Sequence, residues 1–263
     1  MKASTKIFGC IADPIDHVKA PSLFTQIFKE KNIDAVMIPI NVSAINLEQF
    51  FSCIKSVNNF SGLTVTIPHK TKVLRYCDLL EKEANDTQSV NWIKIEKNKI
   101  IGTNFDGIGF TNGMKSNGFS ISNKEFAIFG IGGAGSAICH SLLRNNVKKL
   151  KLINRNIKNL NNFVKKLNKL NYKTEILVDD FVNYDISNFD YVINATSLGL
   201  KENKDLIFDV KKTKLDATII DIIMEPEETI LIKEAKKYNR NYHLGKNMLS
   251  SQVDLAGKFF NLW

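Results

Sequence analysis

A single stretch, Phe129-Gly130-Ile131-Gly132-Gly133-Ala134-Gly135-Ser136, decides the fold of the second half of this 263-residue chain. It has the spacing G-x-G-x-x-G, follows the apolar run Phe126–Phe129 and opens a segment of helical character, 134–144. Such glycines allow a tight turn, and the N–H groups that begin the helix bind a pyrophosphate. A glycine-rich turn without a ligand has the same local pattern. The residues expected to contact a dinucleotide are Gly130, Gly132, Gly133, Ala134 and Gly135.

The next apolar run indicates which dinucleotide binds. NAD sites usually carry Asp or Glu about 20 residues further on, where the carboxylate accepts from the ribose 2′-OH. Here the run ends in Asn154-Arg155, with Lys158 one helical turn further. No carboxylate stands there to repel a 2′-phosphate, and a guanidinium pairs well with one. We predict NADP(H), bound through Asn154, Arg155 and Lys158; a solvated Arg–Lys pair on a basic protein is the alternative.

Strands and helices alternate on both sides of this turn, which predicts the α/β class. In the second half, the runs at 150–154, 175–178, 191–194 and 217–221 indicate strands, with helices at 159–170 and 228–238. This order predicts a doubly wound Rossmann sheet. In the first half, strands are expected at 6–11, 35–40 and 63–67, helices at 22–31 and 44–57, and a hairpin at 90–103. A mixed, mainly parallel sheet follows.

The expected domain division follows from these two series. Residues 1–104 form a substrate-binding and catalytic domain, and 105–241 form the dinucleotide-binding domain. The last stretch, 246–263, is expected to be helical and apolar on one broad face. It therefore needs a surface to pack on, and we expect segment 242–263 to return to the first domain. Two domains facing each other across a cleft would bring a cofactor to a substrate.

Composition narrows the class of protein. The formal charge is +9, from 36 basic and 27 acidic residues, but no nucleic-acid-binding motif organises these charges. An attraction for small anions is the milder consequence. No apolar run is long enough to span a membrane, and the first residues lack the apolar core of a signal peptide. We expect a cytoplasmic protein with a small-molecule substrate, no nucleic-acid, membrane or metal partner, and a monomeric or homodimeric state.

Further motifs stand in a fixed order along the chain. They are Gly62-Leu63-Thr64-Val65-Thr66-Ile67-Pro68-His69-Lys70, then Val90-Asn91, Gly102-Thr103-Asn104-Phe105-Asp106-Gly107-Ile108-Gly109, Asn194-Ala195-Thr196-Ser197-Leu198-Gly199, and finally Gly245, Met248-Leu249 and Gln252. With the glycine-rich turn, this set resembles the shikimate dehydrogenase family over essentially the whole chain. The resemblance implies NADP-dependent, reversible reduction of 3-dehydroshikimate to shikimate, a step of chorismate and aromatic amino acid biosynthesis.

The resemblance also implies roles for particular residues. Lys70 and Asp106 match the catalytic pair: a ketone that receives a hydride develops negative charge on oxygen, which needs a proton donor and positive charge. Which of the two transfers the proton stays open. The amides expected to bind ring hydroxyls are those of Asn91 and Gln252. Thr66 also matches a substrate-binding position. The residues expected beside the ribose and nicotinamide are Thr196, Met224 and Gly245.

The chain departs from the family pattern where a substrate carboxylate would bind. The family has two serines in an H-S-x-S-P pattern, whereas this chain has His17-Val18-Lys19-Ala20-Pro21. Thr64 stands where asparagine is common, Trp92 where a small threonine is usual, and Met224 where tyrosine is typical. Three hypotheses follow: a dehydrogenase with a rebuilt carboxylate site, an enzyme for a related cyclic polyol or ketone, and a non-catalytic NADP-binding regulator.

Overall fold

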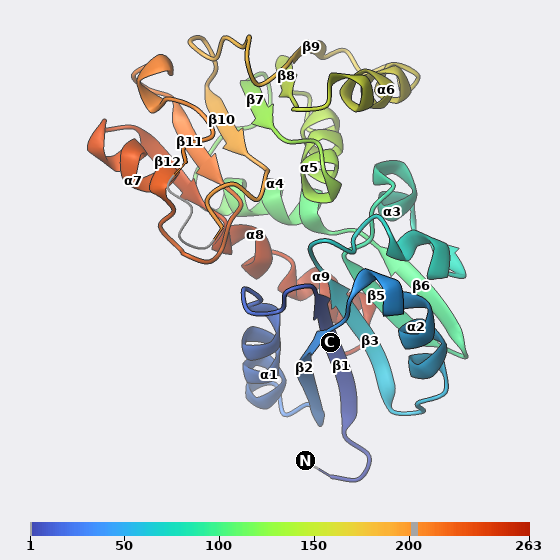
Figure 1. Cartoon of the computed structure of the whole chain (residues 1–263). Helices are drawn as coiled ribbons and strands as arrows, with labels where there is room; N and C mark the ends of the chain where they lie inside the picture. The colour runs from blue at the N-terminus through green and yellow to red at the C-terminus, as the bar shows by residue number, and fades with distance from the viewer. Residues whose placement is uncertain (1, 201–204) are drawn as a thin grey trace. The chain divides into compact units, whose positions relative to one another are not determined.

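The computed structural model describes residues 2–200 and 205–263, and the chain divides into two compact units. Unit 1 contains the residues up to Asp106 together with Gln252–Trp263, and unit 2 is Gly107–Ser251. Within the described residues, no helix has the length and apolar character that crossing a membrane requires. Each unit is built on its own six-stranded sheet (Figure 1).

The sheet of unit 1 has the strand order β2-β1-β3-β5-β6-β4. Its strands are β1 (Lys6–Ala12), β2 (Ala35–Asn41), β3 (Phe60–Val65), β4 (Leu79–Leu80), β5 (Trp92–Glu96) and β6 (Lys99–Thr103). β1 pairs in parallel with β2 and β3, while β5 runs antiparallel to both β3 and β6. The two-residue turn Lys97-Asn98 has φ of 51° and 60°, the left-handed geometry that closes a tight hairpin.

Helices cover both faces of this sheet. One face, with Leu63 and Ile93, packs against α2 (Leu47–Lys55) and α3 (Lys82–Thr87). The other face carries an aromatic-rich group, which we call the aromatic cluster. Its buried members are Phe8, Cys10, Ala20, Phe24, Phe28, Met37, Trp92, Phe105, Ala256, Phe259 and Phe260. They join this face to α1 (Ala20–Glu30) and to the last helix, α9 (Val253–Phe259).

The sheet of unit 2 is entirely parallel, in the order β12-β11-β10-β7-β8-β9. Its strands are β7 (Glu125–Phe129), β8 (Lys149–Ile153), β9 (Glu175–Asp179), β10 (Tyr191–Asn194), β11 (Thr218–Asp221) and β12 (Asn241–Leu244). The order reverses between β7 and β10, as in the Rossmann fold. The predicted class, a mixed sheet followed by a Rossmann sheet, is confirmed.

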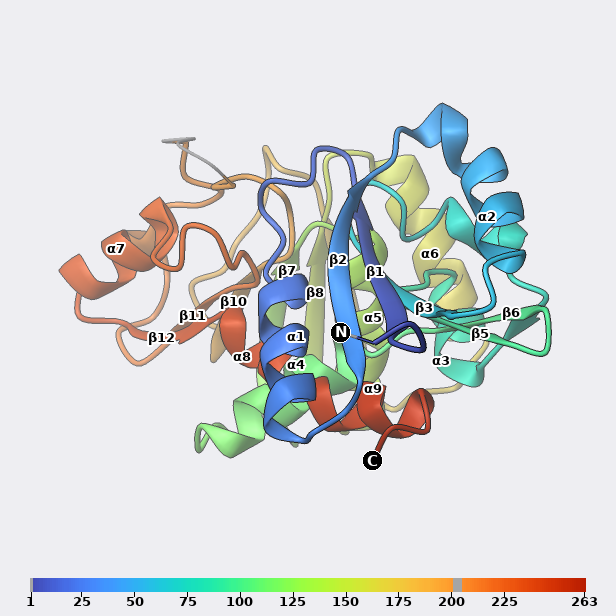
Figure 2. The ribbon, with the colours of Figure 1, turned by 90° about the horizontal axis from the view of Figure 1, so that it is seen from below.

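Apolar clusters also cover both faces of this second sheet. One face packs against α4 (Asp106–Ser116), α5 (Gly133–Arg144), α6 (Ile157–Asn168) and α8 (Lys246–Ser250). The opposite face packs against α7 (Ile230–Lys237) and the loops around Ile186 and Phe208. Figure 2 shows the same elements after a quarter turn.

The structure differs from the sequence-based expectations at the second domain boundary. Unit 1 resumes at Gln252 and not at residue 242, because Asn241–Leu244 pairs with β11 as the edge strand β12. The expected continuous helix at 246–263 is two helices, α8 and α9, separated at Ser251-Gln252. Strand β3 also begins earlier than expected, at Phe60, which pairs with Ile7 of β1 just before a register shift between Ile7 and Phe8.

Candidate active site

The side chains of Lys70 and Asp106 form a buried ion pair in unit 1. Lys70 Nζ donates to Asp106 Oδ2 at 2.5 Å, and the two side chains are 15% and 3% exposed. Lys70 lies in the turn that follows β3, and Asp106 is the first residue of α4, directly after β6. The two predicted catalytic residues are therefore in contact. The pair holds an ammonium donor against a carboxylate that has little water to solvate it.

Two amide side chains converge on the same carboxylate. Asn91 Nδ2 donates to Asp106 Oδ1 at 2.8 Å, and Gln252 Nε2 approaches that oxygen at 3.4 Å. The Asn91 amide is oriented by the backbone N–H of Phe105, which donates to its Oδ1 at 2.8 Å. Asn104 Oδ1 accepts from the Asp106 backbone N–H and so fixes the start of α4. The structure thus brings together Lys70, Asp106, Asn91 and Gln252, residues that are far apart in the sequence.

The turn that carries Lys70 is held by its neighbour His69. This imidazole is fully buried, and its Nε2 lies 2.7 Å from the backbone oxygen of Val42. Burial lowers the pKa of His69, although the hydrogen bond with Val42 acts in the opposite direction. The ring is therefore neutral near pH 7, and Nε2 carries the proton that it donates to the Val42 oxygen. A neutral histidine here anchors the turn without adding charge next to the lysine.

The residues expected around a substrate carboxylate offer few donors. Val18 packs against the aromatic cluster, and Ala20 belongs to it as the first residue of α1. Thr64 is buried, and its hydroxyl donates to the Asn91 backbone oxygen at 3.1 Å. Thr66 is partly buried after β3, and its backbone oxygen accepts from the His69 N–H. The positions that carry serines in the family are therefore apolar in this chain.

In unit 2, the glycine-rich turn joins β7 to α5 in a geometry that requires glycine. Gly130 has a φ of 93°, and a Cβ there would lie 2.6 Å from Thr196 Cγ2. A Cβ on Gly135 would lie 2.0 Å from the backbone oxygen of Gly130, so the first turn of α5 packs directly on the loop. Gly132, Gly133 and Ala134 form the entry to α5. Their N–H groups stand at the positive end of the helix dipole, where phosphates bind.

The residues expected to select NADP(H) follow β8. Asn154 Oδ1 accepts from the backbone N–H of Ile131 at 3.3 Å, which ties this segment to the glycine-rich turn. Arg155 is exposed directly after it, and Lys158 is exposed in the first turn of α6. Both cations lie on segments that follow β8, the strand next to β7, which leads into the glycine-rich turn.

Thr196 belongs to a buried polar network at the ends of β10 and β11. Asn194 Oδ1 accepts from the backbone N–H and the hydroxyl of Thr196, at 3.0 and 2.7 Å. Asn194 Nδ2 donates to Asp221 Oδ1 at 3.2 Å, and Thr229 donates to Asp221 Oδ2 at 2.7 Å. Asp221 and Thr229 were not predicted from the sequence to belong to the site. The available signal was a lone carboxylate at the end of the apolar run 217–221.

The network also supports the loop that carries Met224. Asp221 Oδ1 accepts from the backbone N–H of Ile223 at 3.0 Å, which fixes the chain just before Met224. Met224 is partly exposed. Gly245 is buried against the backbone of Ile222, because a Cβ there would lie 2.5 Å from the Ile222 oxygen. Gly245 thus packs against the loop that carries Met224.

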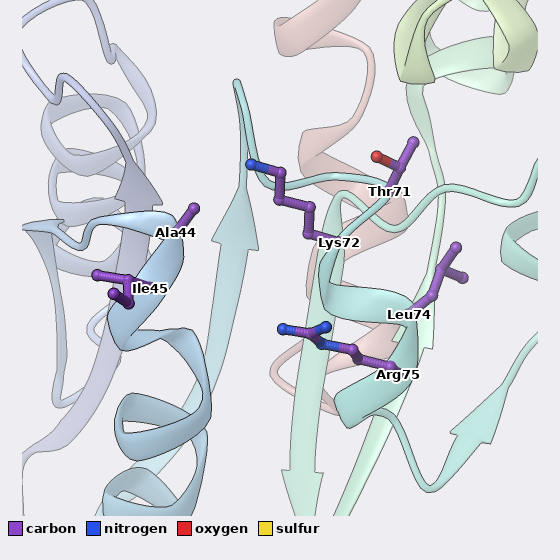
Figure 3. Close-up of a pocket in the computed structure, with 6 residues that line it drawn as sticks. All are labelled: Ala44, Ile45, Thr71, Lys72, Leu74 and Arg75. Carbon is purple, nitrogen blue, oxygen red and sulfur yellow. The ribbon is translucent and has the colours of Figure 1, made fainter.

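A hollow of about 560 Å³ lies in unit 1 beside the turn that carries Lys70. It is lined by Ala44, Ile45, Thr71, Lys72, Leu74 and Arg75. Figure 3 shows the side chains of Lys72 and Arg75 reaching toward the helical turn that holds Ala44 and Ile45. Arg75 donates to the hydroxyl of Tyr76 at 2.6 Å. Across residues 2–200 and 205–263, no group of three or more His, Cys, Asp or Glu side chains is placed to hold a metal ion.

Comparison with known proteins assigns the family. Residues 10–93 match the model of the shikimate dehydrogenase substrate binding domain, and residues 114–226 match that of shikimate / quinate 5-dehydrogenase. The chain is 34% identical over 267 residues to shikimate dehydrogenase (NADP(+)) from Methanocaldococcus jannaschii, covering 100% of this chain and 93% of that protein. The corresponding protein of Methanococcus maripaludis is 33% identical, covering 100% and 92%.

Solved structures agree with these matches. A crystal structure of shikimate dehydrogenase in complex with NADP+ has a TM-score of 0.91 at 33% identity, covering 99% of this chain and 91% of that one. The shikimate dehydrogenase of Aquifex aeolicus gives 0.88 at 28% identity, covering 99% and 94%. The chain belongs to the shikimate dehydrogenase family.

The Asp221 network generates a prediction about stability and pH. Burial raises the pKa of Asp221 from its ordinary 3.8 to about 6, although hydrogen bonds from Ile223, Thr229 and Asn194 act the other way. Between these values the folded protein binds more protons than the unfolded chain, so the free energy of unfolding falls as pH rises. The full contribution is about 3 kcal/mol at 1.36 kcal/mol per pKa unit. Asp221→Asn should reduce this fall, as measured by urea denaturation from pH 4 to 7.

A matched control is Asp216→Asn, which removes an exposed carboxylate from the loop before β11. It should leave the pH dependence as it is in the unmodified protein. Identical pH profiles for Asp221→Asn and the unmodified protein would contradict a raised pKa at Asp221.

Proposed function

We propose that this protein is an NADP-dependent shikimate dehydrogenase that interconverts 3-dehydroshikimate and shikimate. The observation that carries the proposal is the buried Lys70–Asp106 pair, with the amides of Asn91 and Gln252 on the same carboxylate. Relatives that match this chain over its full length carry the name shikimate dehydrogenase (NADP(+)). A non-catalytic nucleotide-binding module has no use for such a pair.

The mechanism assigns separate tasks to the two charged residues. NADPH, when bound, supplies the hydride that reduces the ketone carbon. The Lys70 ammonium then donates a hydrogen bond or its proton to the substrate oxygen, on which negative charge develops. Asp106 holds the ammonium in place and accepts a hydrogen bond from a substrate hydroxyl. In the oxidation direction the steps reverse, and the hydroxyl proton returns to the neutral amine that Lys70 becomes when it donates its proton.

NADP(H) is proposed as the cofactor on the basis of the residues in unit 2. The turn at Gly130 and Gly135 suits a pyrophosphate. It packs closely on the first turn of α5, where the free backbone N–H groups of a helix start can bind phosphate. Arg155 and Lys158 supply positive charge after β8, where a ribose 2′-phosphate would be recognised. Thr196, Met224 and Gly245 are proposed to lie beside the ribose and the nicotinamide. A crystal structure at 33% identity to this chain was solved in complex with NADP+.

A second candidate is the reduction of a related cyclic ketone that lacks the carboxylate. The apolar Val18 and Ala20, together with the internally bonded hydroxyl of Thr64, favour it. Each hydrogen bond to a charged group is worth about 1.5–3 kcal/mol, so loss of two such donors weakens carboxylate binding at least a hundredfold. In both cases we propose a cytoplasmic enzyme, monomeric or homodimeric, that acts on a small molecule.

The direct test is the absorbance of the reduced nicotinamide with purified protein, shikimate, and either NADP or NAD. Reduction of NADP by shikimate supports the first candidate. If NADP binds but shikimate is not oxidised, the first candidate is wrong. A panel of cyclic polyols without a carboxylate then tests the second candidate.

The ion pair generates a prediction for turnover. Lys70→Ala should lower kcat by about 10²–10⁴, because the group that neutralises the developing oxyanion is lost. NADP(H) affinity should change little. Steady-state kinetics and fluorescence titration with NADPH measure the two effects. Lys72→Ala, at an exposed lysine two residues away, is the control and should retain turnover. Wild-type kcat in Lys70→Ala would show that the assigned mechanism is wrong.

Arg155 generates a prediction for cofactor choice. Arg155→Ala should raise the Kd for NADPH by about 10–100-fold, since an ionic hydrogen bond to phosphate is lost. The Kd for NADH should change less than about twofold. Lys165→Ala, on an exposed position of α6, controls for the loss of surface charge. Equal losses for both cofactors would remove Arg155 from the 2′-phosphate site.

The apolar residues Val18 and Ala20 generate a prediction for the KM of shikimate. Val18→Ser combined with Ala20→Ser should lower the KM for shikimate by about a hundredfold, because two hydroxyl donors return to the carboxylate site. The KM for NADP should stay unchanged in the same assay. An unchanged KM for shikimate would mean that the carboxylate binds elsewhere.

A further inference from the structure

Trp92 lies beside the active-site amides, and the proposed mechanism gives it no task. It is the first residue of β5, is fully buried and pairs with Thr64 on β3. Its ring contacts Phe24 and Phe260, with centroid distances of 5.0 and 5.7 Å. Its Nε1 donates to Gln252 Oε1 at 2.7 Å. Trp92 therefore joins the aromatic cluster to an amide that the family resemblance places at a ring hydroxyl of the substrate.

The direction of this amide follows from which groups can donate. An indole N–H is a donor only, so the Gln252 atom that faces it must be the oxygen. Asn91 Nδ2 donates to the same oxygen at 3.0 Å. The Asn91 amide cannot reverse without losing the bond from the Phe105 N–H to its Oδ1. Two fixed donors thus face Gln252 Oε1, and Nε2 points toward Asp106.

The same donor count shows what each amide can offer a substrate. The two hydrogens of Asn91 Nδ2 are directed to Asp106 Oδ1 and to Gln252 Oε1. Gln252 Nε2 has one long contact, at 3.4 Å to Asp106 Oδ1, and a second hydrogen that this contact does not use. A substrate hydroxyl that meets Gln252 therefore accepts a hydrogen bond. Its own proton is then available to the Asp106 carboxylate.

We propose that Trp92 is a positioning residue that holds the Gln252 amide in the orientation that donates to a substrate hydroxyl. The inference rests on the proposed function, because it concerns the same substrate site. Without the indole N–H, Asn91 alone orients Gln252, and the reversed amide would present an acceptor to a hydroxyl that must donate to Asp106. Specificity for a ring hydroxyl at this position depends on the tryptophan.

Trp92→Phe is the first test, because it keeps an aromatic ring in the cluster and removes the N–H. The KM for shikimate should rise about tenfold, the change expected for one buried hydrogen bond. The kcat and the KM for NADP should change by less than about threefold. A uniform fall in kcat with an unchanged KM for shikimate would overturn the inference.

A double-mutant cycle separates positioning from packing. If Trp92 acts through Gln252, then Trp92→Phe should add nothing to the KM change already caused by Gln252→Ala. Phe260→Leu is the matched control, since Phe260 contacts the same indole but forms no hydrogen bond to Gln252. It should lower the melting temperature and leave the KM for shikimate unchanged.

The outcomes distinguish this inference from the proposed function. Suppose that the enzyme oxidises shikimate, but the effects of Trp92→Phe and Gln252→Ala on the KM for shikimate multiply in the double variant. The role of Trp92 would then be overturned, while the proposed function would stand. A rise in KM for Phe260→Leu equal to that for Trp92→Phe would also overturn it, because packing would then explain both. An unmodified protein that binds NADP but does not oxidise shikimate would overturn the proposed function, and this inference with it.

Discussion

One buried carboxylate, Asp106, organises the substrate-binding unit. Its side chain is 3% exposed, and burying a charge without partners costs several kcal/mol. The partners come from three separate segments: Lys70 after β3, Asn91 before β5 and Gln252 before α9. All three partners are needed to compensate the buried charge of Asp106. The ends of the three segments are therefore fixed relative to one another. The site and the fold of unit 1 are therefore specified by the same contacts.

A second buried carboxylate, Asp221, has partners of a different kind. The side-chain donors to Asp221 are the neutral groups of Asn194 and Thr229, and burial raises its pKa to about 6. Asp106, by contrast, has the ammonium of Lys70 at 2.5 Å. Asp221 is thus suited to hold the ends of β10 and β11 together, whereas Asp106 is suited to charge-dependent chemistry.

Elements with strong local patterns were predictable from the sequence, and those decided by tertiary contacts were not. The strands β1, β2, β8 and β10 lie close to their expected ranges, as does the glycine-rich turn. The helix α4 was not expected, because its glycines lower helix propensity. Position 107 requires glycine, because a Cβ there would lie 2.2 Å from the backbone oxygen of Ala137. Strand β12 is too short to show a clear apolar period, and its conformation is set by its pairing with β11.

The candidate site shows the same division. The pairing of Lys70 with Asp106 agrees with the roles implied by family resemblance. The bond from Trp92 to Gln252 depends on where α9 lies, and the residues 92 and 252 carry no local signal for it. The apolar nature of positions 18 and 20 was visible in the sequence. Their membership of the same cluster as Trp92 needed the structure.

The aromatic cluster has an evolutionary consequence. Val18 and Ala20 share this cluster with Trp92, whose indole N–H donates to the Gln252 amide. Substitutions at residues that share contacts have non-additive effects. We therefore expect epistasis among the three positions: the effect of a substitution at one of them depends on the residues at the other two.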